Sequence, residues 1–326
     1  MAKCLVTKLN GTVDNNNLLR IGEIRLFNTK LSNPTKNTQF MALTFSKDTN
    51  LEIVGDAYFT DSTLAENKGK TISCLANKKT SFYVSNNDCQ IAILDKYSLV
   101  AAETNAHKVG DLEDFRFSKD LSFIAIKGTE QTGDIANLKN LTALTSLVLS
   151  STQVNGDISV LKNLTALTTL SLDNTQVNGD ISALENLTAL TTLHLYNQKT
   201  PITGDIDKLR TLTKCAEIYL WYGKFTGDLA TLPSVCRYVS LEYDKGSVLT
   251  WSTRPSSAKI IAMSVKATLT NIDKMLQDQA QCQVGFIESD ELWKKRILIG
   301  GTRTSASDAA VQTLQSKGYT VAINPA

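Results

Sequence analysis

Apolar residues recur through the middle of the chain with a period of 23 residues, and polar residues fill the positions between them. A Gly-Asp pair followed by isoleucine or leucine opens each period, and successive glycines lie 23, 23, 23, 25 and 23 residues apart. These glycines are Gly110, Gly133, Gly156, Gly179, Gly204 and Gly227. Self-similarity at a short fixed period predicts a solenoid, in which one small unit stacks on copies of itself.

An L-x-x-L-x-L string of apolar residues starts eleven residues after each of these glycines. The strings are Leu121/Ile124/Ile126, Leu144/Leu147/Leu149, Leu167/Leu170/Leu172, Leu190/Leu193/Leu195, Cys215/Ile218/Leu220 and Tyr238/Leu241/Tyr243, with a degenerate seventh at Ile260/Met263/Val265. The last two apolar residues alternate with polar ones, which predicts a short strand with one buried face. We expect these strands to stack in parallel, roughly 4.8 Å apart. The period-three run Ile158/Leu161/Leu164/Leu167 predicts 3₁₀ turns on the opposite, convex side of the coil.

The span 167–181 has the pattern L-x-x-L-x-L-x-x-T-x-V-x-G-x-I. This pattern resembles the leucine-rich-repeat family, in the 23- to 24-residue subtype with Gly-x-Ile after the strand. The resemblance covers about residues 110–265. Thr129, Thr152 and Thr175 stand where the family has an asparagine that binds the neighbouring loop backbone. A threonine hydroxyl can still donate one hydrogen bond in each coil.

The segments on both sides of the repeats have other patterns. Short apolar runs separated by Asn, Gly and Asp clusters predict an antiparallel sandwich or barrel before the repeats. The runs are Ala2–Leu9, Ile21–Phe27, Gln39–Phe45, Leu51–Ile53, Thr71–Leu75, Ser81–Val84 and Gln90–Leu94, with a junction at Ala101–Lys108. After the repeats, a helix is expected over Asn271–Gln281 and another from Ser305 or Ser307 to Lys317, ended by Gly318. Strands are expected at Arg296–Ile299 and Tyr319–Ile323.

These patterns together predict a mixed α/β chain with three parts. Residues 1–105 form a β-sandwich-like anchoring domain, residues 106–266 form a leucine-rich-repeat solenoid of about six or seven repeats with a parallel sheet, and residues 267–326 form a β/α cap. The cap is expected because the last hydrophobic layer of a solenoid must be shielded from water.

Composition excludes several classes of function. The net charge of +2 gives no general electrostatic basis for binding nucleic acid or an anionic membrane. No run of 18 apolar residues is present, so we expect no membrane-spanning helix. The first eight residues lack an apolar segment of signal-peptide length, which favours a cytoplasmic or virion location. The six cysteines are scattered without a Cys-x-x-Cys pair, which argues against zinc and favours a reducing compartment.

The outward positions of the predicted strands supply the best candidate for a binding site. The fourth to sixth repeats place aromatic and acidic residues there, where the second and third repeats present small hydroxyl side chains. The candidates on this concave face are His194, Tyr196, Glu217, Tyr219, Trp221, Glu242 and Asp244. Tyrosine and tryptophan are enriched at binding hot spots, so this face is predicted to bind a protein or a glycan. The alternative is that the aromatic residues pack under the cap or against a second copy in a homo-oligomer.

Other motifs are assigned structural roles. The Asp after each repeat glycine can cap a helical turn; stacked carboxylates could instead hold calcium, but the calcium-binding nonapeptide is absent. Asn140, Asn163 and Asn186 form Asn-Leu-Thr sequons at one repeat position, which indicates a structural asparagine column. The two histidines, His107 and His194, lie in no recognisable nucleophile motif. We therefore predict no catalytic residue, no metal and no cofactor.

The segments 2–9 and 303–311 resemble those of leucine-rich-repeat proteins of gut bacteria and their phages. That resemblance implies a virion-borne fibre or appendage protein, anchored to a larger assembly through residues 1–105. The function predicted from the sequence is therefore non-enzymatic binding. Two alternatives stay open: a bacterial cytoplasmic or cell-surface adaptor or adhesin, and a polysaccharide-modifying enzyme, which would need paired carboxylates in a cleft.

Overall fold

The computed structural model describes most of the chain from residue 99 onward and separate strands before it. The described residues are 11–13, 19–21, 24–27, 38–45, 49–54, 57–59, 71–74, 77, 80–84, 90–93, 99–104, 112–116, 118–128, 131–196, 201–242, 246–285 and 295–324. Backbone contacts divide the chain into two compact units, residues 1–154 and 155–326. The boundary lies inside the repeats, and the candidate binding face belongs entirely to the second unit.

The first unit combines antiparallel strands with the first coils. Its antiparallel strands are β1 (Gly11–Val13), β2 (Leu19–Ile21), β3 (Ile24–Phe27), β4 (Thr38–Phe45), β5 (Thr49–Val54), β6 (Ala57–Phe59), β7 (Thr71–Cys74), β8 (Thr80–Val84) and β9 (Gln90–Ile93). They pair as β1-β2, β3-β9-β5-β7 and β4-β8-β6. The packing of these sheets as a sandwich stays a prediction, and the strand predicted at 2–9 lies outside the described residues.

Strand β10 (Leu99–Thr104) changes the direction of pairing. It runs antiparallel to β4 and parallel to β11 (Phe123–Ile126), which in turn is parallel to β12 (Ser146–Val148). Residues 101–104, which were predicted to belong to the junction before the repeats, form most of this strand. Because β10 pairs on both sides, it supplies the first parallel partner for the repeat strands. Helix α1 (Leu112–Phe115) and 3₁₀ helix η2 (Ile135–Leu138) complete these coils.

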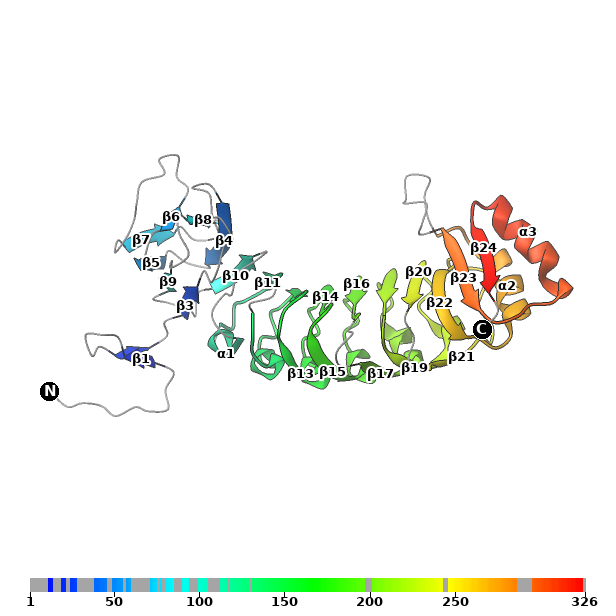
Figure 1. Cartoon of the computed structure of the whole chain (residues 1–326), viewed down its shortest axis with the longest axis horizontal. Coiled ribbons are helices and arrows are strands. Elements are labelled where there is room, and N and C mark those ends of the chain that lie inside the picture. Colours follow the sequence, from blue (N-terminus) through cyan, green and yellow to red (C-terminus); the bar gives the residue numbers. More distant parts are fainter. Residues whose placement is uncertain are drawn as a thin grey trace. The chain divides into compact units, whose positions relative to one another are not determined.

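The second unit is a stack of coils whose strands pair in parallel from one coil to the next (Figure 1). One parallel sheet has the order β14-β16-β18-β20-β22-β23-β24, and a shorter one has the order β13-β15-β17-β19-β21. The first sheet contains β14 (Thr169–Ser171), β16 (Thr192–His194), β18 (Glu217–Tyr219), β20 (Tyr238–Leu241), β22 (Ala262–Thr268), β23 (Arg296–Gly300) and β24 (Thr320–Asn324). The second contains β13 (Asn155–Asp157), β15 (Gln176–Asp180), β17 (Ile202–Asp205), β19 (Lys224–Asp228) and β21 (Val248–Thr250).

Each Gly-Asp pair turns the chain into a 3₁₀ helix on the convex side. The helices are η3 (Ile158–Leu161), η4 (Ile181–Leu184), η5 (Ile206–Thr211) and η6 (Leu229–Thr231). In Asp134, Asp157, Asp180, Asp205 and Asp228, the carboxylate accepts a hydrogen bond from the amide two residues later. The preceding glycines have φ between 109° and 124°, which residues with a Cβ rarely adopt. The predicted capping role is therefore confirmed for these five aspartates.

The leucine strings form the core of the coils. In the second unit Leu167, Leu170 and Leu172 are fully buried, and the equivalent residues of the following coils are at most 2% exposed. Burying one such side chain stabilises the fold by about 1.5–3 kcal/mol. The Thr175 hydroxyl donates to the carbonyl oxygen of Leu172 at 2.8 Å, as the Thr152 hydroxyl does to that of Leu149. In these two coils the threonine hydroxyl therefore donates its hydrogen bond to a carbonyl oxygen of the same coil.

The sixth coil has a different register from the one predicted. Strand β20 aligns Val239 with Ile218 and Ser240 with Tyr219, so its inward residues are Cys236, Val239 and Leu241 rather than Tyr238, Leu241 and Tyr243. The string starts nine residues after Gly227, because η6 has three residues and Pro233 follows soon after it. The convex segment is therefore two residues shorter than in the preceding coil.

The C-terminal elements agree with the predicted ones. Helix α2 (Ile272–Gln281), 3₁₀ helix η8 (Ser305–Ser307) and helix α3 (Asp308–Ser316) flank the last parallel strands, and Gly318 adopts a positive φ of 87° after α3 (Figure 1). Trp251 is 1% exposed and its indole nitrogen donates to Asp278 of α2 at 3.0 Å. Within the described residues, none of the helices is long and apolar enough to cross a bilayer.

Candidate functional site

Strand register sets three rows of outward side chains across the concave sheet of the second unit. The middle row follows the pairing of residues from strand to strand and consists of His194, Tyr219, Ser240, Ser264 and Leu298. The row before it contains Thr192, Glu217, Tyr238 and Ala262. Arg296 continues this row, because Met263 pairs with Ile297 and Ala262 is therefore level with Arg296. The row after it contains Tyr196, Trp221 and Glu242, each following an inward leucine.

Five ring side chains from three adjacent coils form two contacting groups in these rows. We call them the aromatic patch: His194, Tyr196, Tyr219, Trp221 and Tyr238. The centroids of His194 and Tyr219 lie 4.4 Å apart in an edge-to-face pair, those of Tyr219 and Tyr238 lie 5.1 Å apart, and those of Tyr196 and Trp221 lie 5.0 Å apart. Such pairs add about 0.5–1.5 kcal/mol beyond the area they bury, so the rings hold one another in place.

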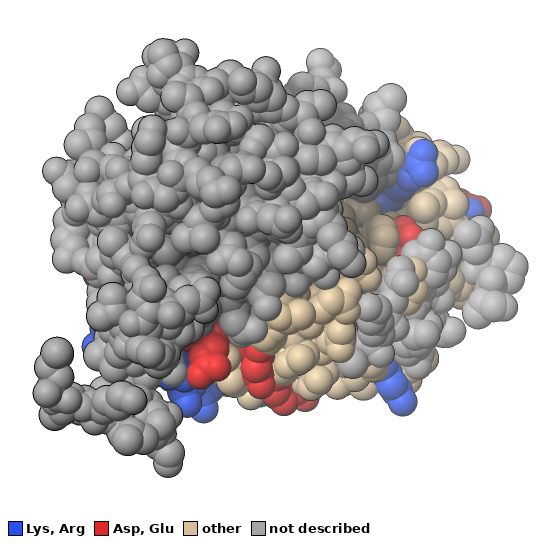
Figure 2. Space-filling model, turned by 60° about the vertical axis from the view of Figure 1, so that its left-hand side comes forward, with Lys and Arg blue, Asp and Glu red and all other residues tan. Residues whose placement is uncertain are grey.

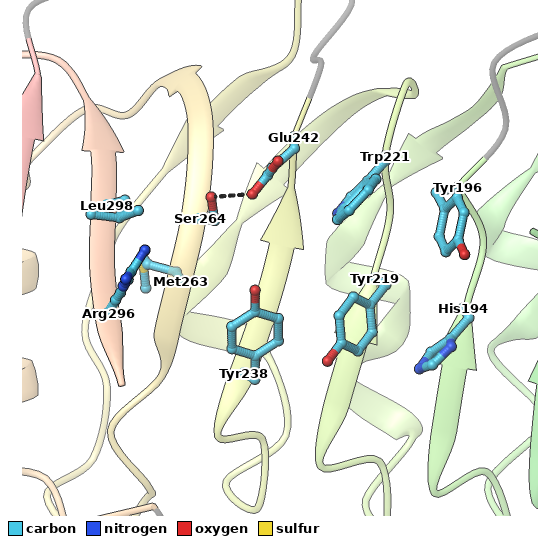
Figure 3. A pocket seen from close by; sticks show the side chains of 10 residues that line it. All are labelled: His194, Tyr196, Tyr219, Trp221, Tyr238, Glu242, Met263, Ser264, Arg296 and Leu298. Carbon is cyan, nitrogen blue, oxygen red and sulfur yellow. Dashed lines mark hydrogen bonds between the residues drawn. The ribbon is translucent and has the colours of Figure 1, made fainter. Parts of the chain in front are cut away.

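A hollow of about 430 Å³ lies beside the aromatic patch (Figure 3). Its lining residues are His194, Tyr196, Tyr219, Trp221, Tyr238, Glu242, Met263, Ser264, Arg296 and Leu298. In the outward rows the side chains of β20 and β22 are small at Ser240, Ala262 and Ser264, whereas the flanking strands carry Trp221 on one side and Leu298 on the other. The change in side-chain size along the rows therefore produces the hollow.

Polar contacts orient the side chains around the hollow. The Trp221 indole nitrogen donates to the Ser240 hydroxyl at 2.6 Å. The Ser264 hydroxyl donates to Glu242 at 2.7 Å, the bond drawn in Figure 3. Glu217 accepts from Arg237 at 2.9 Å and from the Tyr219 hydroxyl at 3.3 Å. The hollow thus combines apolar ring faces, one carboxylate held by a serine, and the Arg296 guanidinium.

A buried carboxylate supports the other end of the patch. Asp173 is 4% exposed, accepts from the Ser171 hydroxyl at 2.8 Å and lies 3.8 Å from Nδ1 of His194. It also accepts from the backbone amide of Tyr196 at 3.3 Å. Burial, with a smaller contribution from the Asp173 charge, raises the pKa of the Tyr196 hydroxyl above its ordinary value. Tyr196 therefore stays neutral at physiological pH and can donate a hydrogen bond.

The structure brings together most of the predicted site residues but changes their rows. His194, Tyr196, Tyr219, Trp221 and Glu242 line the hollow, and Glu217 lies beside it in an ion pair with Arg237. The predicted string Tyr238/Leu241/Tyr243 places Glu242 between its last two inward residues, which is the middle row. The shorter sixth coil moves Glu242 to the row of Trp221 and moves Ser240 into the middle row. Asp244 lies outside the described residues. Whether any of these residues binds a ligand stays a prediction.

Sequence reasoning missed the other residues of the hollow: Tyr238, Met263, Ser264, Arg296 and Leu298. Tyr238 was assigned an inward position, although Cys236, Val239 and Leu241 have the same internal spacing and are better inward residues than two tyrosines. That preference was the available signal. A strand was predicted at Arg296–Ile299, but no repeat links it to the coils, so its outward residues could not be placed.

Charge and metal chemistry give no further candidate in the described part of the chain. No group of three or more His, Cys, Asp and Glu residues is placed there to hold a metal ion. On the face seen in Figure 2, blue and red side chains lie in small groups among uncharged ones, without a continuous basic surface over the described residues. The predicted calcium alternative and nucleic-acid binding thus gain no support from these residues.

The coil defines the class of fold. A 23-residue unit with a parallel concave strand, a buried leucine ladder and a 3₁₀ helix on the convex side is the leucine-rich-repeat architecture. No protein-family model matches the chain, and no curated protein matches it.

Several solved structures have similar coils. An internalin from Listeria monocytogenes is 18% identical with a TM-score of 0.43, covering 71% of this chain and 69% of that one. The ectodomain of the plant receptor kinase GASSHO1/SCHENGEN3 from Arabidopsis thaliana, in complex with CASPARIAN STRIP INTEGRITY FACTOR 2, is 18% identical with a TM-score of 0.44, covering 69% of this chain and 26% of that one. A plant ice-binding protein is 18% identical with a TM-score of 0.37, covering 57% and 59%. At these values the likeness concerns the repeat type and carries nothing about ligands.

Proposed function

We propose that this chain is a non-enzymatic binding protein that recognises a protein or a cell-surface glycan through the aromatic patch and the adjoining hollow. The observation that carries the proposal is that five rings, in two contacting groups, line one hollow of about 430 Å³ on a concave sheet. Four of the five rings are half-buried, so part of each ring faces solvent, while Tyr238 is 4% exposed. Keeping such rings in contact with water costs free energy that a ligand recovers when it covers them.

The arrangement of the patch supports recognition rather than core packing. Inward leucines already fill the core beneath these strands, with Leu193, Leu195 and Leu220 at most 1% exposed. The rings on the opposite side of the same strands therefore add nothing to that core. Tyrosine and tryptophan present a large rigid contact area with few rotatable bonds, which lowers the entropy lost on binding.

A polysaccharide-modifying enzyme is the competing proposal, and the described hollow favours it less. Hydrolysis of a glycosidic bond requires two carboxyl groups on opposite sides of the bond, roughly 5–9.5 Å apart. Among the described lining residues, Glu242 is the carboxylate, and it accepts a hydrogen bond from Ser264. Glu217, the nearest acidic neighbour in the rows, is paired with Arg237. Binding without turnover is therefore the better account.

The finer form of the proposal places the chain in a phage virion, as a fibre or appendage component anchored through residues 1–105. Its support is the resemblance of segments 2–9 and 303–311 to proteins of gut bacteria and their phages. Mass spectrometry of purified virions tests this: peptides of the chain at stoichiometric abundance are expected. Their absence from virions, together with recovery from host cells, would favour the bacterial adaptor or adhesin instead.

A glycan and protein array screened with the intact chain tests the binding proposal. We expect ligands that the Tyr219→Ala/Trp221→Ala double variant loses, because truncating central aromatic anchors costs at least about 2 kcal/mol each. The matched control is Thr169→Ala/Thr192→Ala, which changes two threonines of the same sheet that do not line the hollow. The proposal fails if the double variant binds every array ligand as well as the control does.

Light scattering separates ligand binding from the homo-oligomer alternative. If the patch is covered by a second copy, the intact chain will have twice the monomer mass, and the Tyr219→Ala/Trp221→Ala variant will be a monomer. If the patch is a recognition surface, the mass will be that of a monomer for both proteins. If the intact chain is a dimer and the double variant is a monomer, the patch is a self-association surface and the proposal of a separate ligand fails.

A further inference from the structure

We infer that the hollow takes a single sugar ring that carries a carboxylate, such as a uronic or nonulosonic acid residue of a glycan. This inference rests on the proposed function and specifies the ligand of the same site. It assigns Arg296 to the carboxylate, the Trp221 and Tyr219 rings to the apolar face of the sugar, and Glu242 to a sugar hydroxyl.

The size of the hollow favours a small occupant. Its volume of about 430 Å³ lies in the lower part of the range of about 300–1,000 Å³ typical of small-molecule sites. The walls stand on β18 and β23, which are three strand steps apart, or roughly 14 Å between backbones at about 4.8 Å per step. After the wall side chains are subtracted, the space suits one ring rather than an extended chain.

One wall is a fixed aromatic platform. Tyr196 packs behind Trp221 with a centroid distance of 5.0 Å, and the bond from the indole nitrogen to Ser240 at 2.6 Å sets the rotation of the ring. Tyr219 is likewise held between His194 and Tyr238. Because these rings are pre-ordered, a sugar that covers them with its C–H face loses little free energy to side-chain ordering.

The opposite wall carries the positive charge. Arg296 lies on β23, is exposed, and lines the hollow next to Leu298 (Figure 3). It forms no ion pair with another residue that the structure describes, in contrast to Arg237, which binds Glu217 at 2.9 Å. A guanidinium presents a planar fork of donors that matches the two oxygens of a carboxylate. Arg296 is therefore the group that selects an anionic sugar over a neutral one.

Glu242 supplies the acceptor that a sugar hydroxyl needs. Its carboxylate has about four lone-pair positions, and the Ser264 hydroxyl occupies one of them at 2.7 Å. A ligand carrying only a carboxylate and no hydroxyl would place its charge near Glu242 without compensation. The presence of an acceptor and a cationic donor in one hollow thus fits a ring that bears both hydroxyls and a carboxylate.

A peptide fits these features less well. The interior strands β18, β20 and β22 use their backbone groups to pair with neighbours, so an added peptide strand finds no open edge on this face. A lysine or arginine side chain placed on the rings would meet the like charge of Arg296. The described residues therefore favour a glycan, and peptide binding becomes an outcome of the test.

Matched sugar pairs test the inference. Saturation-transfer NMR on the intact chain would compare methyl glucuronide with methyl glucoside, methyl galacturonide with methyl galactoside, and a methyl sialoside with its methyl ester. For at least one pair we expect the acid to bind about tenfold or more tightly than its neutral partner, since hydrogen bonds to a charged group contribute about 1.5–3 kcal/mol. Equal binding of acid and neutral partner, or no acid bound at millimolar concentration, would overturn the inference.

Two variants separate the inference from the proposed function. Arg296→Gln is expected to remove the preference for the acid and to leave binding of the neutral partner within about twofold, whereas Trp221→Ala is expected to remove both. Arg210→Gln, an exposed arginine of η5, is the control and should behave as the parent. An unchanged acid preference in Arg296→Gln refutes the role of Arg296 while the aromatic site stands. If the array ligands are peptides whose binding depends on Trp221, the sugar inference is refuted and the aromatic binding site stands. If the array ligands bind equally well without Trp221, the proposed binding site itself is refuted.

Discussion

Replacing Arg254 with methionine should destabilise the second unit by about 3–5 kcal/mol. Arg254 is 3% exposed and directs its whole guanidinium at backbone carbonyls. Nε donates to Lys259 at 3.1 Å, Nη1 donates to Leu232 at 2.9 Å and more weakly to Ala230 at 3.4 Å, and Nη2 donates to Pro233 at 3.0 Å and to Cys236 at 3.3 Å. Four of these five carbonyls belong to the shortened convex segment of the sixth coil.

The magnitude follows from counting the three shorter bonds. Each hydrogen bond from a charged donor contributes about 1.5–3 kcal/mol, and a buried carbonyl left without a donor costs about 1–3 kcal/mol. Against this loss, methionine carries no charge and so avoids the free-energy cost of burying one. That cost is visible in the pKa of Arg254, which burial lowers below its ordinary value. The offset leaves a net loss of about 3–5 kcal/mol, similar to breaking a buried ion pair.

Urea unfolding with linear extrapolation would measure the change in free energy of unfolding. Hydrogen exchange of peptides spanning residues 229–242 would show whether the loss starts in the sixth coil, because repeat proteins can open locally. Arg210→Met, which changes an exposed arginine on η5, is the control and should shift stability by less than about 0.5 kcal/mol. A loss below about 1 kcal/mol for Arg254→Met would refute this account of the shortened segment.

Two further predictions concern the turns and the cap. Gly179→Ala should cost about 2–3 kcal/mol of unfolding free energy, because φ is +115° and the new Cβ would lie 2.7 Å from Oδ1 of Asp157, which caps η3. Asp273→Asn should reduce the acid sensitivity of the cap. Hydrogen bonds from Ser307 and then Thr304 lower the Asp273 pKa, so its stabilisation is complete above the unfolded value near 3.9 and is lost as pH falls through the lower folded value. Urea midpoints for both variants, the second at pH 6 and pH 3, provide the measurement.

Each of these predictions has an outcome that contradicts it. A Gly179→Ala protein with the parent urea midpoint would show that the turn adapts to a Cβ without strain. For Asp273→Asn, the expected pattern is a lower midpoint than the parent at pH 6 and a difference that shrinks toward pH 3. A constant difference between the two proteins at both pH values would show that the charge of Asp273 is not what its neighbours stabilise.

The repeat could be predicted from the sequence because each of its features is local. The 23-residue spacing, the Asp cap after a glycine and the alternation in Leu170 and Leu172 each depend on residues within one coil. The same applies to α3, which Gly318 ends with a positive φ. Local steric and hydrogen-bonding rules are enough to place such elements.

The register of the sixth coil could not be taken from the spacing alone. A fixed distance from Gly227 placed Tyr238 inside, whereas the chain shortens its convex segment and turns Tyr238 outward. Arg254, more than twenty residues after that segment begins, satisfies its carbonyls. A contact between residues that far apart in the chain leaves no periodic trace, so counting could not reveal it.

The sequence by itself determined the coil, its caps and the aromatic side chains on one face, because a repeated local pattern must repeat its backbone and its buried side. Tertiary structure alone decided where the hollow lies. It joins Trp221 and Arg296, residues 75 positions apart, across strands whose order in the sheet follows from stacking and not from spacing. The small residues Ser240 and Ser264 lie side by side between these walls only because the strands pair in this register.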